Sequence, residues 1–275
     1  MKKRKKWPRI IMYTILVIYA IVTLYPFLWA VFSSFKTYAE IVGGGMRILP
    51  VNWTFDNFVY IFFRDENFLN WVWNSFYVAG VGAILNIIFN SMAGYALARL
   101  SFPGKKSWFM LILALIMVPG QILLIPNFLV MRTLGLLNTH WALILPSAIN
   151  FAFIFMMRQF FVNFPKDIEE AAALDGLSRF QVFFRIVIPM ARAAIATQGI
   201  FSFMGLWNQF MEPLLYLSSP HLFTLPLGLQ TFQDLYATQW NYILAGSVIS
   251  LVPILILYVL LNKYFMQGFR VGGDK

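Results

Sequence analysis

The chain has 275 residues, of which 60% are hydrophobic and only 12% charged, with a net charge of +10 and a mean hydropathy of +0.71. This balance excludes a soluble globular protein and predicts a chain whose main solvent is lipid. Cysteine is absent, which excludes disulfides, iron–sulfur ligation and thiol nucleophiles in this chain. The two histidines, His140 and His221, are far apart in the sequence, so we expect no metal site.

Six apolar stretches are long enough to cross about 30 Å of hydrocarbon as helices. Their residues do not alternate between apolar and polar, as the strands of an outer-membrane barrel would. The first stretch is longer than a signal-peptide core and lacks a cleavage site, so we expect it to be retained. The sequence thus predicts an all-α membrane protein, one domain over 1–275 with six transmembrane helices. The predicted spans are about 10–33, 74–98, 108–131, 141–161, 193–216 and 243–262.

Polar side chains inside these spans are candidates for a translocation path, because such groups are costly in hydrocarbon. In the second span Asn86 and Asn90 share a helical face with Gly94, where another helix could pack closely. In the fifth span Phe203 and Trp207 share a face that suits the CH face of a sugar. Ordinary helix packing explains the same residues, and both interpretations stay open. The complete candidate path is Asn86, Asn90, Gln121, Asn150, Phe203, Trp207 and Asn208.

Prolines interrupt the third and fourth spans. Pro119, Pro126 and Pro146 each remove a backbone donor and favour a kink.

Lysine and arginine are distributed unevenly among the segments that connect the spans. The N-terminus, the second and fourth connections and the tail hold six, three, five and three of them, which is seventeen of the 21. Because basic residues flank spans on the cytoplasmic side, we expect both termini in the cytoplasm of a prokaryote and the protein in its plasma membrane. The basic residues lie in separate short loops rather than on one face, so the charge does not indicate nucleic-acid binding.

A polar loop of about residues 163–190 separates the fourth and fifth spans. Pro165 and the acids after it predict a short helix from about Pro165 to Asp175, which Gly176 ends in a left-handed turn. Ser178 and Gln181 have the spacing of a capping box and predict a second helix. The residues alone leave open whether this loop is a docking site or an amphipathic helix at the membrane surface.

Glu170-Ala171-Ala172, Gly176 and Ile186-Val187-Ile188-Pro189 resemble the EAA signature of ABC importer permeases, EAA-x3-G-x9-I-x-L-P. Only Ile188 departs from the pattern, where the family has leucine. Four further segments resemble the carbohydrate-uptake class and its smaller, maltose-system-like permease: Tyr25-Pro26-Phe27, Ser33-Ser34-Phe35-Lys36, Pro50-Val51-Asn52-Trp53-Thr54, and Trp207-Asn208-Gln209-Phe210 with Pro213-Leu214.

The resemblance implies a type I ABC importer permease fold, in which the first short helix of the loop is a coupling helix docked on a cytoplasmic ATPase. It implies as partners two ATPase copies, a second permease and an extracytoplasmic sugar-binding protein, with ATP and Mg²⁺ bound by the ATPases. This chain would carry no cofactor and catalyse no reaction, since it has no phosphate-binding glycine loop. The implied coupling residues are Glu169, Glu170, Ala171, Ala172, Asp175, Gly176 and Pro189.

Two other functions were weighed. A secondary transporter usually carries charged residues for ion coupling inside its spans, and a membrane enzyme needs a clustered catalytic set. Neither pattern is evident in the sequence. A permease for a sugar phosphate or a polyol would have almost the same sequence features, so the sugar itself stays open.

Overall fold

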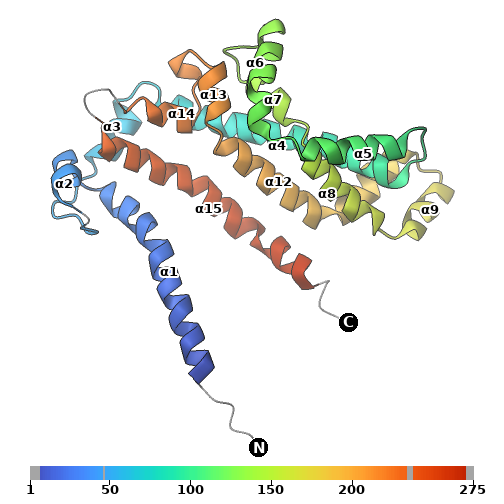
Figure 1. Cartoon of the computed structure of the whole chain (residues 1–275), viewed down its shortest axis with the longest axis horizontal. Helices are drawn as coiled ribbons and strands as arrows, with labels where there is room; N and C mark the ends of the chain where they lie inside the picture. The colour runs from blue at the N-terminus through green and yellow to red at the C-terminus, as the bar shows by residue number, and fades with distance from the viewer. Residues whose placement is uncertain (1–6, 46, 234–237, 271–275) are drawn as a thin grey trace, which may run out of the picture. The chain divides into compact units, whose positions relative to one another are not determined.

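A computed structural model describes residues 7–45, 47–233 and 238–270. Helices dominate these residues, and the one strand-like pairing among them is an isolated antiparallel bridge between Gln233 and Thr238. The predicted all-α class is therefore confirmed. The helices, labelled in Figure 1, are α1 (Trp7–Ser33), α2 (Tyr38–Gly43), α3 (Asp56–Phe63), α4 (Phe68–Arg99), α5 (Lys105–Ile116), η1 (Gly120–Leu123), α6 (Leu124–Thr133), α7 (Trp141–Ser147), α8 (Phe151–Val162), α9 (Lys166–Leu174), α10 (Arg179–Val182), η2 (Phe183–Val187), α11 (Ile188–Met190), α12 (Arg192–Trp207), α13 (Met211–Tyr216), η3 (Pro220–Leu222), α14 (Leu225–Gln230) and α15 (Trp240–Arg270).

Three of the described helices are long and apolar enough to cross a membrane, and six spans result if each sharply bent helix pair counts as one. The larger number equals the number predicted from the sequence. The three bent pairs are α5 with η1 and α6, α7 with α8, and the helices from Arg179 to Met190 with α12. Their bends are 97°, 41° and 82° respectively.

The bends in the first two pairs fall near prolines that were predicted to kink the chain. Pro119 directly precedes η1, and Pro146 lies in the last turn of α7. The fifth span differs from the prediction, because α12 ends at Trp207 and Asn208 caps it. Its expected continuation to residue 216 is instead a separate short helix, α13.

The described chain divides into two compact units. Unit 1 takes the residues up to Phe68 together with Gly228–Pro253, and unit 2 takes Leu69–Leu227 with the residues from Ile254 on. The expected single domain over 1–275 stays a prediction.

Unit 1 is held together by a buried asparagine. The Asn57 amide donates hydrogen bonds to the carbonyls of Ser34 and Lys36, both at 2.8 Å, and its oxygen accepts one from Asn241. These bonds tie the segment after α1 to α3 and to the start of α15. Burial lowers the pKa of the Lys36 ammonium, which donates to the Arg47 carbonyl. α1 itself exposes apolar side chains on all sides within this unit, as expected of a helix whose surroundings are lipid or partner subunits.

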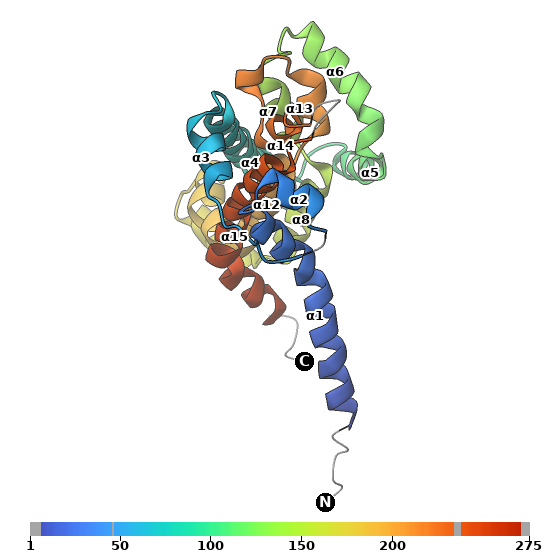
Figure 2. The same cartoon turned by 90° about the vertical axis from the view of Figure 1, so that its left-hand side faces the viewer.

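Unit 2 has its helices in two groups. α6, α7 and α13 lie together at one end in both views (Figures 1 and 2), and Figure 1 shows α9 at the other end. Close packing between α4 and α8 depends on Gly94, because a Cβ there would lie 2.8 Å from the Met157 Cβ and 2.9 Å from the Arg158 backbone nitrogen. The prediction that Gly94 allows a helix to pack closely is confirmed.

Candidate coupling loop and transmembrane cavity

The polar loop between the fourth and fifth predicted spans folds as two short helices with a tight turn. α9 runs from Lys166 to Leu174, and Gly176 follows it with φ of +81°, a conformation that a residue with a Cβ adopts only with strain. Ser178 and Gln181 form a reciprocal capping box, in which the Ser178 N–H donates to the Gln181 side chain at 2.8 Å. The predicted helix, left-handed glycine and capping box are all confirmed.

α9 has one face on the protein and one face free. Ala172 is 5% exposed and packs in a cluster with Phe161, Phe183 and Val187. Glu170 and Ala171 are exposed, and Leu174 at the end of the helix is 90% exposed, the highest fraction among the large hydrophobic residues described. Single exposed apolar side chains are common on protein surfaces, and Leu174 marks the face of α9 that the folded chain leaves uncovered.

Glu169 faces the protein, unlike Glu170 beside it. Its carboxylate forms an ion pair with Arg99 Nε at 3.0 Å and accepts a hydrogen bond from the Tyr95 hydroxyl at 2.8 Å. The Arg99 and Glu169 side chains are 5% and 11% exposed, and Arg99 also donates to the carbonyl of Phe164. α9 is thus anchored to the last turns of α4.

The resemblance implied Glu169 as one of the coupling residues, and in the structure its carboxylate lies in this internal anchor. A spacing signal was available, because Glu169 lies three residues before Ala172, on the face of α9 that is buried. Of the remaining predicted coupling residues, Glu170, Ala171, Asp175, Gly176 and Pro189 are exposed and Ala172 is buried.

The residues after α10 change the direction of the chain. Phe183–Val187 form a π-helical turn, and the chain bends by 82° between Met190 and Arg192, after Pro189. π-Turns and prolines disturb the regular hydrogen-bond ladder and allow such a bend. The candidate coupling loop, residues 163–190, therefore leads directly into α12.

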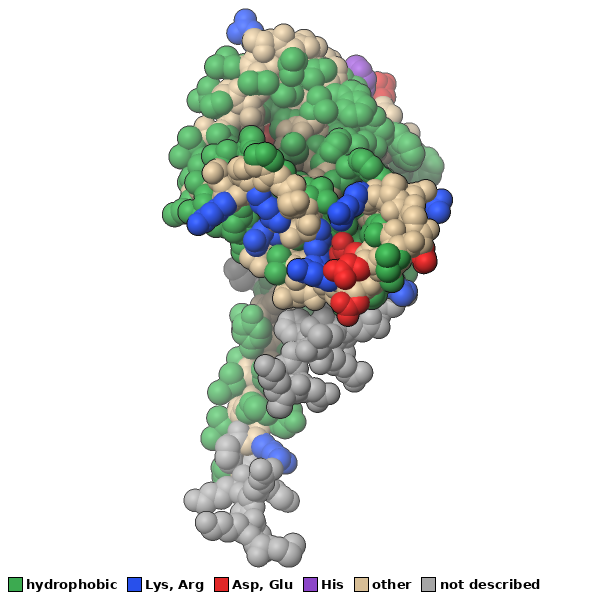
Figure 3. All heavy atoms as spheres, turned by 90° about the vertical axis from the view of Figure 1, so that its right-hand side faces the viewer, with side chains coloured by type: hydrophobic (Ala, Val, Ile, Leu, Met, Phe, Trp, Pro, Cys, Tyr) green, Lys and Arg blue, Asp and Glu red, His purple; other side chains and the backbone are tan. Residues whose placement is uncertain are grey.

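On the face shown in Figure 3, Lys and Arg side chains gather beside a smaller group of Asp and Glu side chains.

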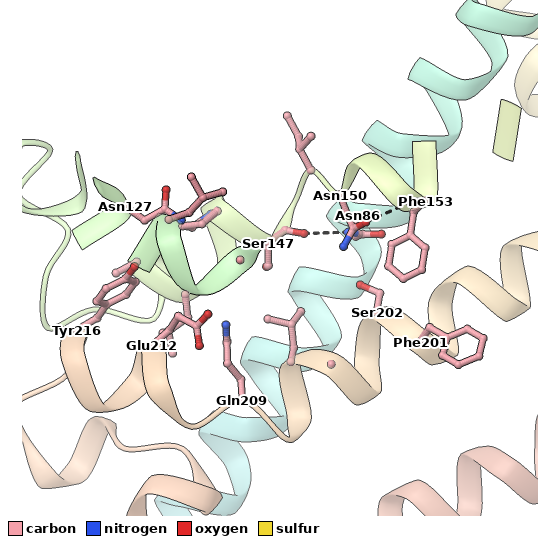
Figure 4. A pocket seen from close by; sticks show the side chains of 18 residues that line it. Asn86, Asn127, Ser147, Asn150, Phe153, Phe201, Ser202, Gln209, Glu212 and Tyr216 are labelled. Atoms are coloured by element: carbon pink, nitrogen blue, oxygen red, sulfur yellow. Dashed lines mark hydrogen bonds between the residues drawn. The ribbon is translucent and has the colours of Figure 1, made fainter. Parts of the chain in front are cut away.

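Unit 2 also contains a cavity of about 370 Å³, shown in Figure 4. It lies where two bent helix pairs break, because its lining includes Gly120 at one break and Ser147, Ile149 and Asn150 at the other. Irregular backbone at membrane depth is tolerated where it is buried in protein or lines a cavity. The other lining residues are Asn86, Leu123, Asn127, Ala142, Leu143, Pro146, Phe153, Phe201, Ser202, Gly205, Leu206, Gln209, Glu212 and Tyr216.

Asn86 and Asn90 satisfy backbone groups at the break between α7 and α8. Asn86 donates to the Ser147 carbonyl at 2.8 Å, and Asn90 donates to the Ala148 carbonyl at 3.2 Å while accepting from the Asn150 N–H at 2.9 Å. Both asparagines are at most 2% exposed. Their main visible role is to stabilise this broken helix, which favours the packing interpretation over contact with substrate.

Gln198 extends this network to α12. Its amide nitrogen donates to the backbone carbonyl of Asn86 at 2.9 Å and to the side-chain oxygen of Asn86 at 3.1 Å. The side-chain oxygen of Gln198 accepts a hydrogen bond from the Ser91 hydroxyl. Sequence reasoning missed Gln198, although a glutamine within an apolar span is itself a signal of a buried network.

Of the other predicted path residues, only Asn150 lines the cavity. Asn150 lines the cavity but its side chain caps α8, accepting from the Ala152 and Phe153 N–H groups. Trp207 is 1% exposed and packs on Phe203 and Phe76, with ring centroids 5.7 and 4.8 Å away. Gln121, Phe203, Trp207 and Asn208 are not among the cavity-lining residues.

A polar group at one end of the cavity was not anticipated. Gln209, Glu212 and Tyr216 come from the segment after α12, and Asn127 comes from α6 (Figure 4). The predicted fifth span runs to residue 216 without a break, whereas in the structure the chain breaks at Asn208 and these side chains line the cavity. A polar side chain every three or four residues, from Gln209 to Glu212 to Tyr216, is the signal that marks this face.

Comparison with known proteins identifies the family. Residues 90–271 match the family described as the inner membrane component of binding-protein-dependent transport systems. The arabinooligosaccharides transport system permease protein AraQ of Halalkalibacterium halodurans is 37% identical over 93% of this chain and 92% of its own length. The sulfoquinovosyl glycerol transport system permease protein SmoH of Agrobacterium fabrum is 36% identical over 92% of this chain and 89% of its own.

A solved structure agrees with these relatives. The crystal structure of a bacterial ABC transporter involved in import of the acidic polysaccharide alginate contains a chain that superposes with a TM-score of 0.86 at 25% identity, covering 96% of this chain and 99% of that one. These proteins are transport subunits rather than enzymes, as predicted. The chain therefore belongs to the family of binding-protein-dependent transport system inner membrane components, the permease subunits of ABC importers.

Proposed function

We propose that the chain is one of two permeases of an ATP-driven carbohydrate importer and that α9 is its coupling helix. The observation that carries this proposal is the construction of α9, which is anchored on one face by Glu169 and Arg99 and leaves Leu174 90% exposed. A helix that served only to cover the membrane surface would not need a buried ion pair to its neighbour. A helix that must transmit force needs a rigid connection inside and a free surface outside.

The motion would pass along two connections. A displaced α9 pulls on α4 through the ion pair to Arg99, and on α12 through the π-helical turn and the bend after Pro189. Both α4 and α12 contribute lining residues to the cavity, Asn86 and Ser202 among them. Closure of two ATPases by ATP would then switch the cavity between inward-open and outward-open states. We propose that ATP and Mg²⁺ are bound by those ATPases.

The carbohydrate substrate is proposed from the relatives, whose names specify arabinooligosaccharides and sulfoquinovosyl glycerol. A binding protein delivering the sugar accords with the family description. The basic residues favour an orientation with both termini and α9 in the cytoplasm, where the ATPases are.

Purification of the tagged chain from its native membranes in mild detergent, with mass spectrometry of the bound proteins, tests the assembly. We expect an ATPase and a second permease. The variant Gly176→Pro places a ring that fixes φ near −65° where the native φ is +81°, so it should release the ATPase and keep the second permease. Recovery of the native chain alone would contradict the proposal.

Reconstitution of the purified complex in proteoliposomes tests the activity. Uptake of a radiolabelled neutral oligosaccharide should require both internal ATP and the binding protein encoded with the complex. Uptake that continues without ATP, driven by an ion gradient, would support a secondary transporter and refute the importer.

A further inference from the structure

A single carboxylate determines the charge of the cavity lining. Among its eighteen lining residues Glu212 is the only one with a charged side chain. The sole ion pair among the described residues joins Arg99 to Glu169, so no Lys, Arg or His nitrogen of that part of the chain lies within 4.0 Å of the Glu212 carboxylate. Within the described residues, the one carboxylate of the cavity lining therefore has no ion-pair partner.

Two neighbouring polar groups also lack partners. Tyr216 is 3% exposed, and its hydroxyl makes no hydrogen bond within the described chain. The side-chain oxygen of Gln209 is likewise buried and unpaired there. Buried polar groups are normally hydrogen-bonded, and those that are not deserve an explanation such as a ligand. Figure 4 shows the Gln209 and Glu212 side chains projecting toward the same space.

This group has the chemistry of a site for hydroxyl groups. The Glu212 carboxylate and the Gln209 oxygen accept hydrogen bonds, and the Tyr216 hydroxyl both donates and accepts. A sugar hydroxyl can satisfy such groups as a donor and acceptor at once. A carboxylate, phosphate or sulfonate on the substrate cannot donate, and it would lie beside a like charge in a site of reduced dielectric.

We propose that Glu212, with Gln209 and Tyr216, forms a subsite of the translocation cavity that accepts uncharged, hydroxyl-rich substrates and excludes anionic ones. The inference rests on the proposed transport function and specifies its substrate class. It separates this chain from the importer of acidic alginate that shares its fold, and from a permease for a sugar phosphate or a sulfonated sugar. Neutral oligosaccharides, as named for the arabinooligosaccharide permease, fit the subsite.

The absence of cysteine from the chain allows a direct test. Gly205 lines the cavity, and a Cβ at this position would meet no atom within 4 Å, so Gly205→Cys introduces a thiol without a clash. The assembled complex carrying this variant is treated with a cationic and an anionic methanethiosulfonate reagent of similar size. The ratio of the two modification rates, normalised to that of a free thiol in solution, reports the local potential. The complex without the introduced cysteine gives the background from partner subunits.

We expect the cationic reagent to be favoured by about tenfold or more, since one uncompensated charge acts in a partly desolvated site. Adding Glu212→Gln, which keeps the shape of the side chain, should bring the normalised ratio close to one. Adding Glu212→Asp should retain the preference. Glu66→Gln removes the same charge from an exposed residue of unit 1 and should leave the ratio unchanged.

A normalised ratio near one in the Gly205→Cys complex would overturn the inference, because a cation from a partner subunit would then neutralise Glu212. Equal ratios with and without Glu212→Gln, or a thiol that reacts with neither reagent, would also overturn it. The same complexes are assayed for ATP-driven uptake of a neutral oligosaccharide. If uptake is intact and the ratio is flat, only the subsite is refuted, and if uptake itself fails in the native complex, the proposed function is refuted.

Discussion

Replacement of Asn90 by alanine should destabilise the permease substantially. The Asn90 side chain is fully buried and makes three hydrogen bonds, to the Asn86 and Ala148 carbonyls at 2.7 and 3.2 Å and from the Asn150 N–H at 2.9 Å. The Asn86 carbonyl keeps a second donor in Gln198, but the Ala148 carbonyl and the Asn150 N–H lose the partner that Asn90 provides.

Each buried group left without a partner costs about 1–3 kcal/mol, and hydrogen bonds between membrane helices are worth about 0.6 kcal/mol on average because alternative partners exist. The two orphaned groups together would cost about 2–6 kcal/mol by the first figure, and the lower membrane figure restricts the expected loss to the lower part of that range, about 2–4 kcal/mol. In a chain of this size each kcal/mol lowers the unfolding midpoint by about 2–4 °C. We therefore expect Asn90→Ala to lower the thermal midpoint of the purified complex by at least about 4 °C.

The midpoint is measured by heating the detergent-solubilised complex and following the remaining intact fraction by size-exclusion chromatography. Asn208→Ala is the matched control, because Asn208 is exposed and its side chain bonds, within the described part of the chain, only to the Met204 carbonyl of its own helix. It should change the midpoint by less than about 2 °C, as surface substitutions usually do. Equal midpoints for the two variants would refute the view that Asn90 holds the broken helix together.

Three further variants probe the coupling loop and the packing of α12. Glu169→Gln should leave the buried Arg99 charge without its counterion. ATP-driven uptake should then fall at least about tenfold while the ATPase still co-purifies, and undiminished uptake would show that the ion pair does not transmit motion. Gly176→Ala should destabilise the loop by about 1 kcal/mol, because alanine is strained in a left-handed backbone conformation. The loop should then be cleaved faster by a protease, with a smaller effect for Gly176→Asn, and identical cleavage rates for the alanine variant and the native chain would contradict this. Trp207→Ala should lower the thermal midpoint, because it removes the packing on Phe203 and Phe76 and truncating a buried tryptophan costs about 3–5 kcal/mol. A normal midpoint with altered uptake kinetics would instead favour substrate contact.

The local signals in the sequence were strong enough to predict the structure of the loop of residues 163–190 in detail. The first helix of the loop, the glycine that follows it and the capping box after that glycine depend on residues within a few positions of one another, so their spacing is sufficient. The partners of Glu169 could not be predicted, since Arg99 and Tyr95 lie some seventy residues away in the chain, and its spacing from Ala172 was the one local signal that it is buried. A pair of adjacent glutamates does not by itself indicate which one is buried.

The cavity could be predicted only in part for the same reason. The prolines indicated that the third and fourth spans would bend, yet the space that results depends on how α4, α6 and α12 pack. Asn86 and Asn90 were recognised as costly polar groups, but whether they face a substrate or the carbonyls of a broken helix depends on their partners. Glu212 was hidden because an apolar pattern on both sides of Asn208 resembles one continuous span.

The position of Leu174 offers the most direct test of the central claim, that α9 docks on an ATPase. Because the chain has no cysteine, Leu174→Cys gives this chain a single attachment site for a photoactivated crosslinker, at a position near the end of α9 that is 90% exposed. Val51→Cys, with Val51 59% exposed in unit 1, is the matched control. Crosslinking in native membranes followed by mass spectrometry should join residue 174 to an ATPase and residue 51 to none. An ATPase that is absent from the products at residue 174, or that appears equally at both positions, would contradict the account.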